Sequence, residues 1–190
     1  MSTNTPFARL ISTWTIYLAP AGEAKPVVSA TPAGNWVVVG PTDGEQSVQN
    51  MGKLAFLRDN DHQGPVKSVR GDEDVKARFN LVGLTQENYA KILHDASNVA
   101  ADAGPPATKV IPFKRGNEPT EYALLMKGAL DSPYGAFPGQ IYIPRCVDDS
   151  EPQMVRSRSG SPALSCEFVA LEDDTEASND EMGVWEVQTA

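Results

Sequence analysis

Apolar and polar residues alternate over several stretches of this chain, and the clearest stretch runs from Glu73 to Gly83. Every second residue there is apolar, so a strand would carry one apolar side and one polar side. The apolar side holds Val75, Ala77, Phe79 and Leu81, and the other holds Asp74, Lys76, Arg78 and Asn80. The pattern predicts a strand with one face in the core and the other in polar surroundings.

Two later stretches show the same period of two. One face of 120–130 carries Tyr122, Leu124, Met126 and Leu130, and one face of 162–172 carries Leu164, Cys166, Phe168 and Ala170. The opposite faces are mixed in character, so we expect them to meet water or a channel. A monomeric sandwich and a channel-forming subunit account for this pattern equally well.

A helix is expected at about 85–99. The Thr85 hydroxyl can cap its first turn, and Leu84 can pack on Tyr89. The apolar stripe at helical spacing consists of Tyr89, Ile92, Leu93, Ala96 and Val99.

The remaining pattern is strand-like and rich in turn residues. Predicted strands lie near 12–19, 35–40, 52–58, 65–70, 73–83, 108–114, 120–130, 139–147, 153–158, 162–171 and 182–188. With 15 Gly and 15 Pro between them, they favour a mainly β fold, a β-sandwich or barrel with one helix packed on it. The length favours a single domain, 1–190.

We predict a long protruding β-hairpin loop at 41–71. It has few large apolar residues, and both charge signs lie close together. A connection of this length inside a compact domain is usually functional or disordered. Phe56 and Leu57 are poorly placed for water when alone, so an assembly arm and a loose surface hairpin are the two interpretations.

Charge is placed unevenly. The net charge is −9, yet only two of the 16 basic residues, against 11 of the 25 acidic residues, follow Val147. The acidic residues gather in 148–151 and in an acidic loop at 172–182. Solvated loops or a surface that repels nucleic acid would explain them, and no basic groove for phosphate is evident.

Two cysteines, Cys146 and Cys166, fit no metal spacing and are too few for a disulfide framework. We expect reduced core residues, although a cross-strand contact between them is an alternative. The stretch 10–21 imitates a signal peptide, but its polar residues at every second position indicate a strand. No run is long enough for a membrane helix, so a soluble protein is expected.

Signals for catalysis are weak. The two histidines, His62 and His94, lie near no nucleophile motif, and no P-loop or zinc-protease pattern occurs. The stretch 59–64 resembles the start of a calcium loop, but the twelfth position is Arg70 where a carboxylate is needed. We therefore expect no enzyme, cofactor or metal site.

Several short motifs together resemble the major tail tube proteins of long-tailed, siphovirus-type bacteriophages. The opening strand 12–20, the stretch Asn35-Trp-Val-Val-Val-Gly40 and the helix start Leu84-Thr-Gln-Glu-Asn88 resemble that family in order and character. So do Tyr142-Ile-Pro-Arg145 and the late strand 163–171. The inner tubes of contractile tails and of type VI secretion share this fold, but the long arm looks more like the flexible-tailed group.

The resemblance implies a structural virion protein whose hexameric rings stack into the hollow conduit for DNA. Its partners would be itself, a tape-measure protein, a tail terminator and distal tail or baseplate proteins, and DNA would be present only transiently. It implies location in the virion tail, and in the host cytoplasm during assembly. The expected ring-stacking residues are Lys53, Leu54, Phe56, Leu57, Arg58, Asp59 and Asp61. The candidate lumen or inter-subunit face is Lys76, Arg78, Asn80, Glu121, Lys127 and Glu167.

Two other interpretations stay open. A monomeric binding or decoration module of a virion would be a stable monomer with an aromatic or polar pocket, yet Trp14, Trp36 and Trp185 look like core residues. Lys76, Arg78 and Lys127 would put positive charge on a lumen face. They can instead pair with Glu121 and Glu167 across strands or between subunits.

Overall fold

The computed structural model describes residues 13–59, 61, 64–82, 85–92, 100–102, 104, 106–111, 113, 118–151, 163–175 and 181–189. Within these residues the fold is mainly β, as the alternation predicts. The elements are β1 (Thr15–Pro20), β2 (Val37–Val38), β3 (Thr42–Leu57), β4 (Lys67–Leu81), α1 (Gln86–Ile92), β5 (Ala100–Asp102), β6 (Thr108–Val110), β7 (Glu121–Gly128), β8 (Gly139–Asp148), β9 (Leu164–Ala170) and β10 (Val184–Val187).

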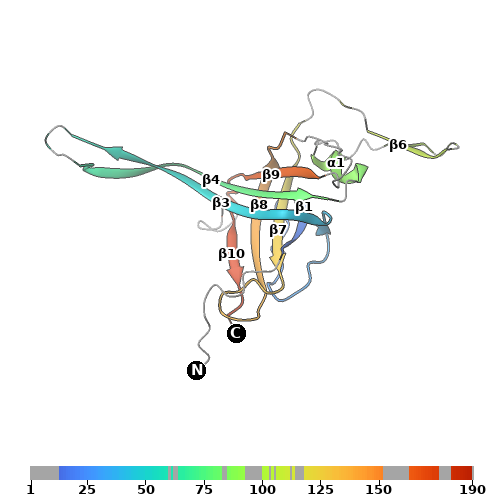
Figure 1. Cartoon of the computed structure of the whole chain (residues 1–190), viewed down its shortest axis with the longest axis horizontal. Coiled ribbons are helices and arrows are strands. Elements are labelled where there is room, and N and C mark those ends of the chain that lie inside the picture. Colours follow the sequence, from blue (N-terminus) through green and yellow to red (C-terminus); the bar gives the residue numbers. More distant parts are fainter. Residues whose placement is uncertain are drawn as a thin grey trace.

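One antiparallel sheet holds eight of these strands, in the order β2-β1-β7-β8-β9-β4-β3, with β10 also paired to β8. Strand β8 joins two parts of the sheet, because its first half pairs with β10 and its last residues pair with β9. Figure 1 shows β3, β4 and β9 crossing β1, β7 and β8 at a steep angle. The sheet therefore folds over itself through β8.

The main core fills the space between these two parts. Phe79 of β4 stacks on Phe168 of β9, with ring centroids 5.7 Å apart. Leu124 and Ile143 face them from β7 and β8, and all four side chains are buried. The predicted apolar faces of 73–83 and 162–171 are thus confirmed, because opposed antiparallel residues share a face.

The expectation that each long strand has a wet second face is wrong for β7. Ala123 and Leu125 belong to a second buried cluster with Trp36 and Tyr142. The segment 21–36 crosses this side of the sheet, where the backbone carbonyl of Glu23 accepts a hydrogen bond from the Tyr142 hydroxyl at 2.8 Å. Both faces of β7 are therefore covered.

Helix α1 begins where the cap predicts. The backbone N–H of Asn88 donates to the Thr85 hydroxyl oxygen at 3.2 Å, and Tyr89 joins the main core. The amide of Asn88 donates to the Val39 carbonyl at 2.5 Å, which ties the helix to the chain beside β2. The described helix ends at Ile92. Leu84 and residues 93–99 lie outside the described residues.

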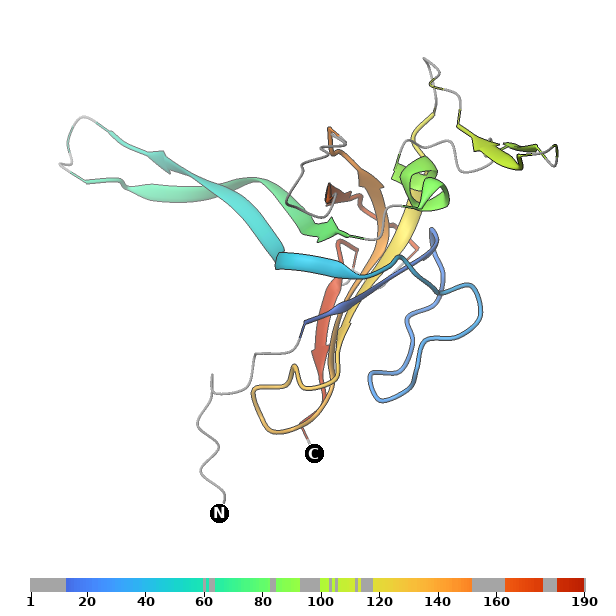
Figure 2. The same cartoon turned by 45° about the vertical axis from the view of Figure 1, so that its right-hand side comes forward.

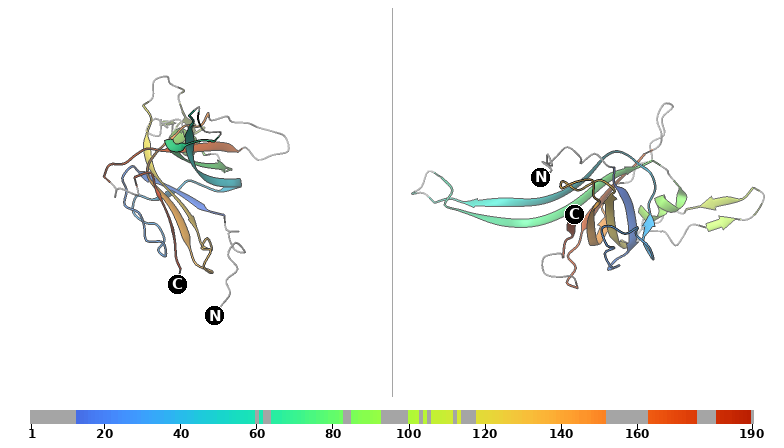
Figure 3. Two further views of the ribbon diagram at one scale, coloured as in Figure 1. Left: turned by 90° about the vertical axis from the view of Figure 1, so that its left-hand side faces the viewer. Right: turned by 90° about the horizontal axis from the view of Figure 1, so that it is seen from below.

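Strands β3 and β4 form a long hairpin that projects from the body of the molecule (Figures 1 and 2). They stay paired from Thr42 and Leu81 out to Leu57 and Lys67. The separate strands expected at 65–70 and 73–83 are therefore one strand, and the arm extends beyond 41–71. We call residues 42–81 the arm, and the right-hand view of Figure 3 shows it extending from the body.

Several other expectations need correction. The strand expected at 35–40 shrinks to β2, the described residues of 108–114 form a strand only at β6, and β5 was not expected. Trp185 is 60 % exposed and not a core residue, although Trp14 and Trp36 do pack inside. Both cysteines are buried free thiols, as expected, and each Sγ lies near a backbone carbonyl. The strand expected at 153–158 lies outside the described residues.

In the described part of the chain, no helix is long and apolar enough to cross a membrane.

Candidate assembly surfaces

The outer half of the arm exposes large apolar side chains on both of its faces. Leu54 and Phe56 alternate along β3 and share one face. Leu57 lies on the other face with Val69, which stands opposite Ala55. Phe56 is 56 % exposed, and Leu54, Leu57 and Val69 are also exposed. A hairpin that lay on a single surface would need only one apolar face, so the arm tip is suited to burial on two sides.

Charged residues accompany this apolar tip. Lys53 and Arg58 flank the apolar stretch of β3, and Asp59 and Asp61 follow it. The Asp61 backbone N–H donates to Asp59 Oδ1 at 3.2 Å, which forms a local turn. Three residues of the 59–64 stretch, Asn60, His62 and Gln63, lie outside the described residues. Elsewhere in the described chain, no group of three His, Cys, Asp or Glu residues could hold a metal ion.

Glu167 of β9 pairs with two of the basic side chains on the candidate lumen face. It stands opposite Arg78 in the β4–β9 register. Arg78 Nε donates to Glu167 Oε2 at 2.7 Å, and Lys76 Nζ donates to Glu167 Oε1 at 2.8 Å. These two hydrogen bonds, first from Arg78 and then from Lys76, lower the pKa of Glu167 to about 2. The expected pairing across strands is present within one chain.

Glu121 does not join this group. Both of its carboxylate oxygens accept hydrogen bonds from Arg145, at 2.6 and 2.8 Å. This bidentate pair lowers the pKa of Glu121. Arg145 lies on β8, next to β7, and an irregularity in register near Tyr122 sets which β8 residue stands beside Glu121. The spacing of Glu121 and Arg145 along the sequence did not indicate that they would pair.

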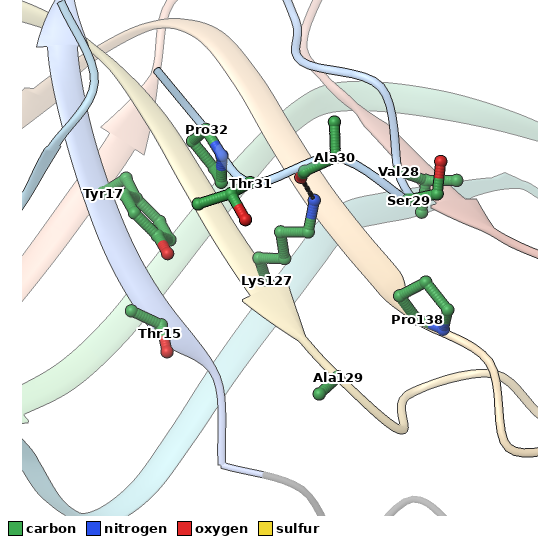
Figure 4. Close-up of a pocket in the computed structure, with 10 residues that line it drawn as sticks. All are labelled: Thr15, Tyr17, Val28, Ser29, Ala30, Thr31, Pro32, Lys127, Ala129 and Pro138. Carbon is green, nitrogen blue, oxygen red and sulfur yellow. Dashed lines mark hydrogen bonds between the residues drawn. The ribbon is translucent and has the colours of Figure 1, made fainter.

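Lys127 is also separate from the carboxylates that were expected to pair with it. Its Nζ donates to the backbone carbonyls of Ala30 and, at 3.3 Å, Val27. Figure 4 shows this side chain reaching across a pocket of about 290 Å³ toward Ala30. Burial lowers the pKa of Lys127. The lysine therefore holds the 27–32 segment over β1 and β7 through hydrogen bonds from its amine to backbone carbonyl oxygens.

Asn80, the last candidate of this face, is half-buried at the base of the arm. It stands opposite Asp43 in β3 and Ser165 in β9. The sequence-based lumen set is thus divided among three places: the Glu167 cluster with Asn80 on β4 and β9, the Glu121 pair on β7 and β8, and the Lys127 pocket.

Sequence reasoning missed two features at the outer edges of the sheet. Trp185 stands exposed on β10, at one edge. An apolar cavity of about 280 Å³ lies beside β2, at the other edge, and Leu18, Val37 and Tyr122 are among its lining residues. A Trp and a valine-rich stretch look like core residues in sequence, because strand order decides which of them lie at an edge.

Comparison of the chain with models of known protein families and with curated protein sequences finds no match.

Proposed function

We propose that this protein is a structural subunit of a phage-type tail tube, in which copies close into hexameric rings and the rings stack into a hollow conduit. The observation that carries the proposal is the arm. It projects well beyond the body and exposes apolar side chains on both faces near its tip (Figure 1). In a monomer the apolar side chains of this tip would stay exposed to water, whereas a stacking contact would bury them.

The charges of the polar faces support the same proposal. Lys76 and Arg78 are held by Glu167, and Arg145 is held by Glu121. Basic side chains that are neutralised within the chain offer phosphate little fixed positive charge. The net charge of −9 adds repulsion. A conduit wall of this kind would let DNA pass without retaining it.

Electron microscopy of the purified, concentrated protein, together with its mass in solution, tests the proposal. We expect hollow rings or tubes from the unaltered chain. The triple variant Leu54→Ser, Phe56→Ser and Leu57→Ser should form rings but no stacked tubes. Val110→Ser is the matched control, because Val110 is similarly exposed but lies on β6, away from the arm; this variant should still form tubes.

A monodisperse monomer at every concentration, without rings or tubes, would refute the proposal. That result would favour a monomeric binding or decoration module of a virion instead. Tubes that form equally well from the triple variant would show that the arm is not the stacking element.

A further inference from the structure

The two outer edges of one part of the sheet, β10-β8-β7-β1-β2, carry complementary features on the same face. The pairing Trp185 with Ile141, Ile141 with Met126 and Met126 with Ile16 places these residues in one row across β10, β8, β7 and β1. Leu18 is two residues from Ile16 and stands opposite Val37. Since opposed residues and alternate residues share a face, Trp185 and the Val37 cavity lie on the same side.

The middle of this face is covered, but both of its edges are open. Strands β3, β4 and β9 cross it and bury Ile16 and Met126. Figure 1 shows β10, β8, β7 and β1 side by side, with β10 and β1 at the two ends. In the described part of the chain, no strand pairs with the outer edge of β10 or of β2. Trp185 is 60 % exposed and Val37 is 52 % exposed.

Strand β10 is held in a way that keeps Trp185 and Glu186 on opposite faces. Its neighbour Glu186 turns to the opposite face, where it accepts a hydrogen bond from Gln140 Nε2 at 3.0 Å and an ion pair from Lys25 at 3.2 Å. Gly183, just before the strand, has φ +130°, and a Cβ there would lie 2.7 Å from the Tyr142 carbonyl oxygen. These contacts fix the backbone on both sides of the tryptophan.

The cavity beside β2 suits an indole. Its wall is predominantly apolar, and Leu18, Pro20 and Val37 contribute to it. Asn35 also lines it and uses Nδ2 to donate to Glu23 at 2.8 Å. The Asn35 side-chain oxygen is therefore the atom that it can offer to an indole N–H, which needs an acceptor when buried.

We propose that Trp185 of one copy inserts into the Val37 cavity of a second copy of this chain. The contact is heterologous, because each copy contributes Trp185 at one edge and the cavity at the other, and such contacts close into rings when the rotation between copies allows it. The inference rests on the proposed function only for ring closure. The contact itself requires only two copies. It is distinct from the arm, which would join rings.

A mixing experiment tests the direction of this contact. All proteins in it carry Leu54→Ser, Phe56→Ser and Leu57→Ser, the triple change that is expected to prevent stacking through the arm. Trp185→Ala and Val37→Asp should each weaken self-association tenfold or more, because each removes one side of the contact. An equimolar mixture should form 1:1 dimers and nothing larger, since one intact Trp185 and one intact cavity remain. Native mass spectrometry or analytical ultracentrifugation measures the masses.

The controls separate folding from contact. Trp185→Phe should retain most of the association. Val27→Asp should retain all of it, because Val27 is even more exposed than Val37 (66 % against 52 %) but lies outside the cavity. Circular dichroism and thermal unfolding should be unchanged in all variants. The inference is overturned if Trp185→Ala associates like its parent, or if the mixture stays monomeric. If Trp185→Ala protein without the arm substitutions forms rings, this inference alone is overturned. If the unaltered chain forms no rings, the proposed function is refuted.

Discussion

Glu167 is the residue whose charge matters most on the polar face of β4 and β9. It accepts hydrogen bonds from Arg78 and Lys76, and its side chain is only 25 % exposed. We expect Glu167→Gln to lower the free energy of unfolding by about 1 kcal/mol at pH 7, the upper range for ion pairs near a surface. Chemical denaturation of both proteins measures this difference.

The difference should depend on pH in a defined window. The pKa of Glu167 falls from its ordinary 4.5 to about 2 on folding. A carboxyl whose pKa is lower in the folded state stabilises the protein above its ordinary pKa, and this contribution is lost as pH falls through the folded-state pKa. The gap between the unaltered protein and Glu167→Gln should therefore shrink between pH 4.5 and 2. A gap that stays constant over this range would contradict the assignment.

For single residues, the hydrogen-bond partner of a charged side chain was harder to predict than the strand face on which that side chain lies. Alternation correctly indicated that Lys76, Arg78 and Glu167 share a polar side, because a period of two is a local property of a strand. The Glu121 partner is Arg145, and the Lys127 partners are the carbonyls of Ala30 and Val27. Both depend on strand order and on the path of a loop, which no local pattern encodes.

At the scale of elements, replacing phenylalanine by alanine should act differently at the base of the arm, which packs in the main core, and near the arm tip. Phe79 is 2 % exposed and stacks on Phe168, so Phe79→Ala should cost about 3–5 kcal/mol of folding stability. Phe56 is exposed near the arm tip, so Phe56→Ala should change stability by about 0.5 kcal/mol or less. Urea unfolding of the two variants under conditions that keep them monomeric measures both values. A large loss from Phe56→Ala would mean that the tip packs on its own chain.

The elements themselves divide into predictable and unpredictable parts. The inner part of β4 and strands β7 and β9 followed from alternation, β8 was expected as a strand at 139–147, and the start of α1 followed from its cap. The outer arm was less clear in sequence, because its strands bury nothing within the chain and so lack a consistent apolar face. A break was also expected at 71–72, between the strands predicted at 65–70 and 73–83, yet β4 continues through it, with only an irregularity in the β3–β4 register between Gly52 and Leu54.

At the scale of the whole molecule, the arrangement of layers decides which surfaces remain open. The segment 21–36 covers a face of β7 that alternation indicated as wet, and the crossing of β3, β4 and β9 leaves Trp185 and the Val37 cavity open at the edges. These results of tertiary packing could not be predicted from periodicity. The protruding hairpin was expected at 41–71, because a long connection without helix inside a compact β domain is usually functional or disordered.

The distribution of charge over the whole molecule leads to a prediction about DNA. The net charge is −9, and Lys76, Arg78 and Arg145 are paired internally. Wild-type protein should therefore show no binding to duplex DNA by fluorescence anisotropy, even at low salt. The double variant Glu121→Gln and Glu167→Gln removes the carboxylates that hold these three cations and, among the described residues, leaves only Asp149, 3.9 Å from Lys76 Nζ. We expect weak binding that disappears as salt is raised. Asp43→Asn with Glu45→Gln changes the net charge equally at the base of the arm, without releasing those cations, and should bind no DNA. Binding by the unaltered protein would contradict a neutralised conduit wall, and equal binding by both double variants would show that net charge alone governs the interaction.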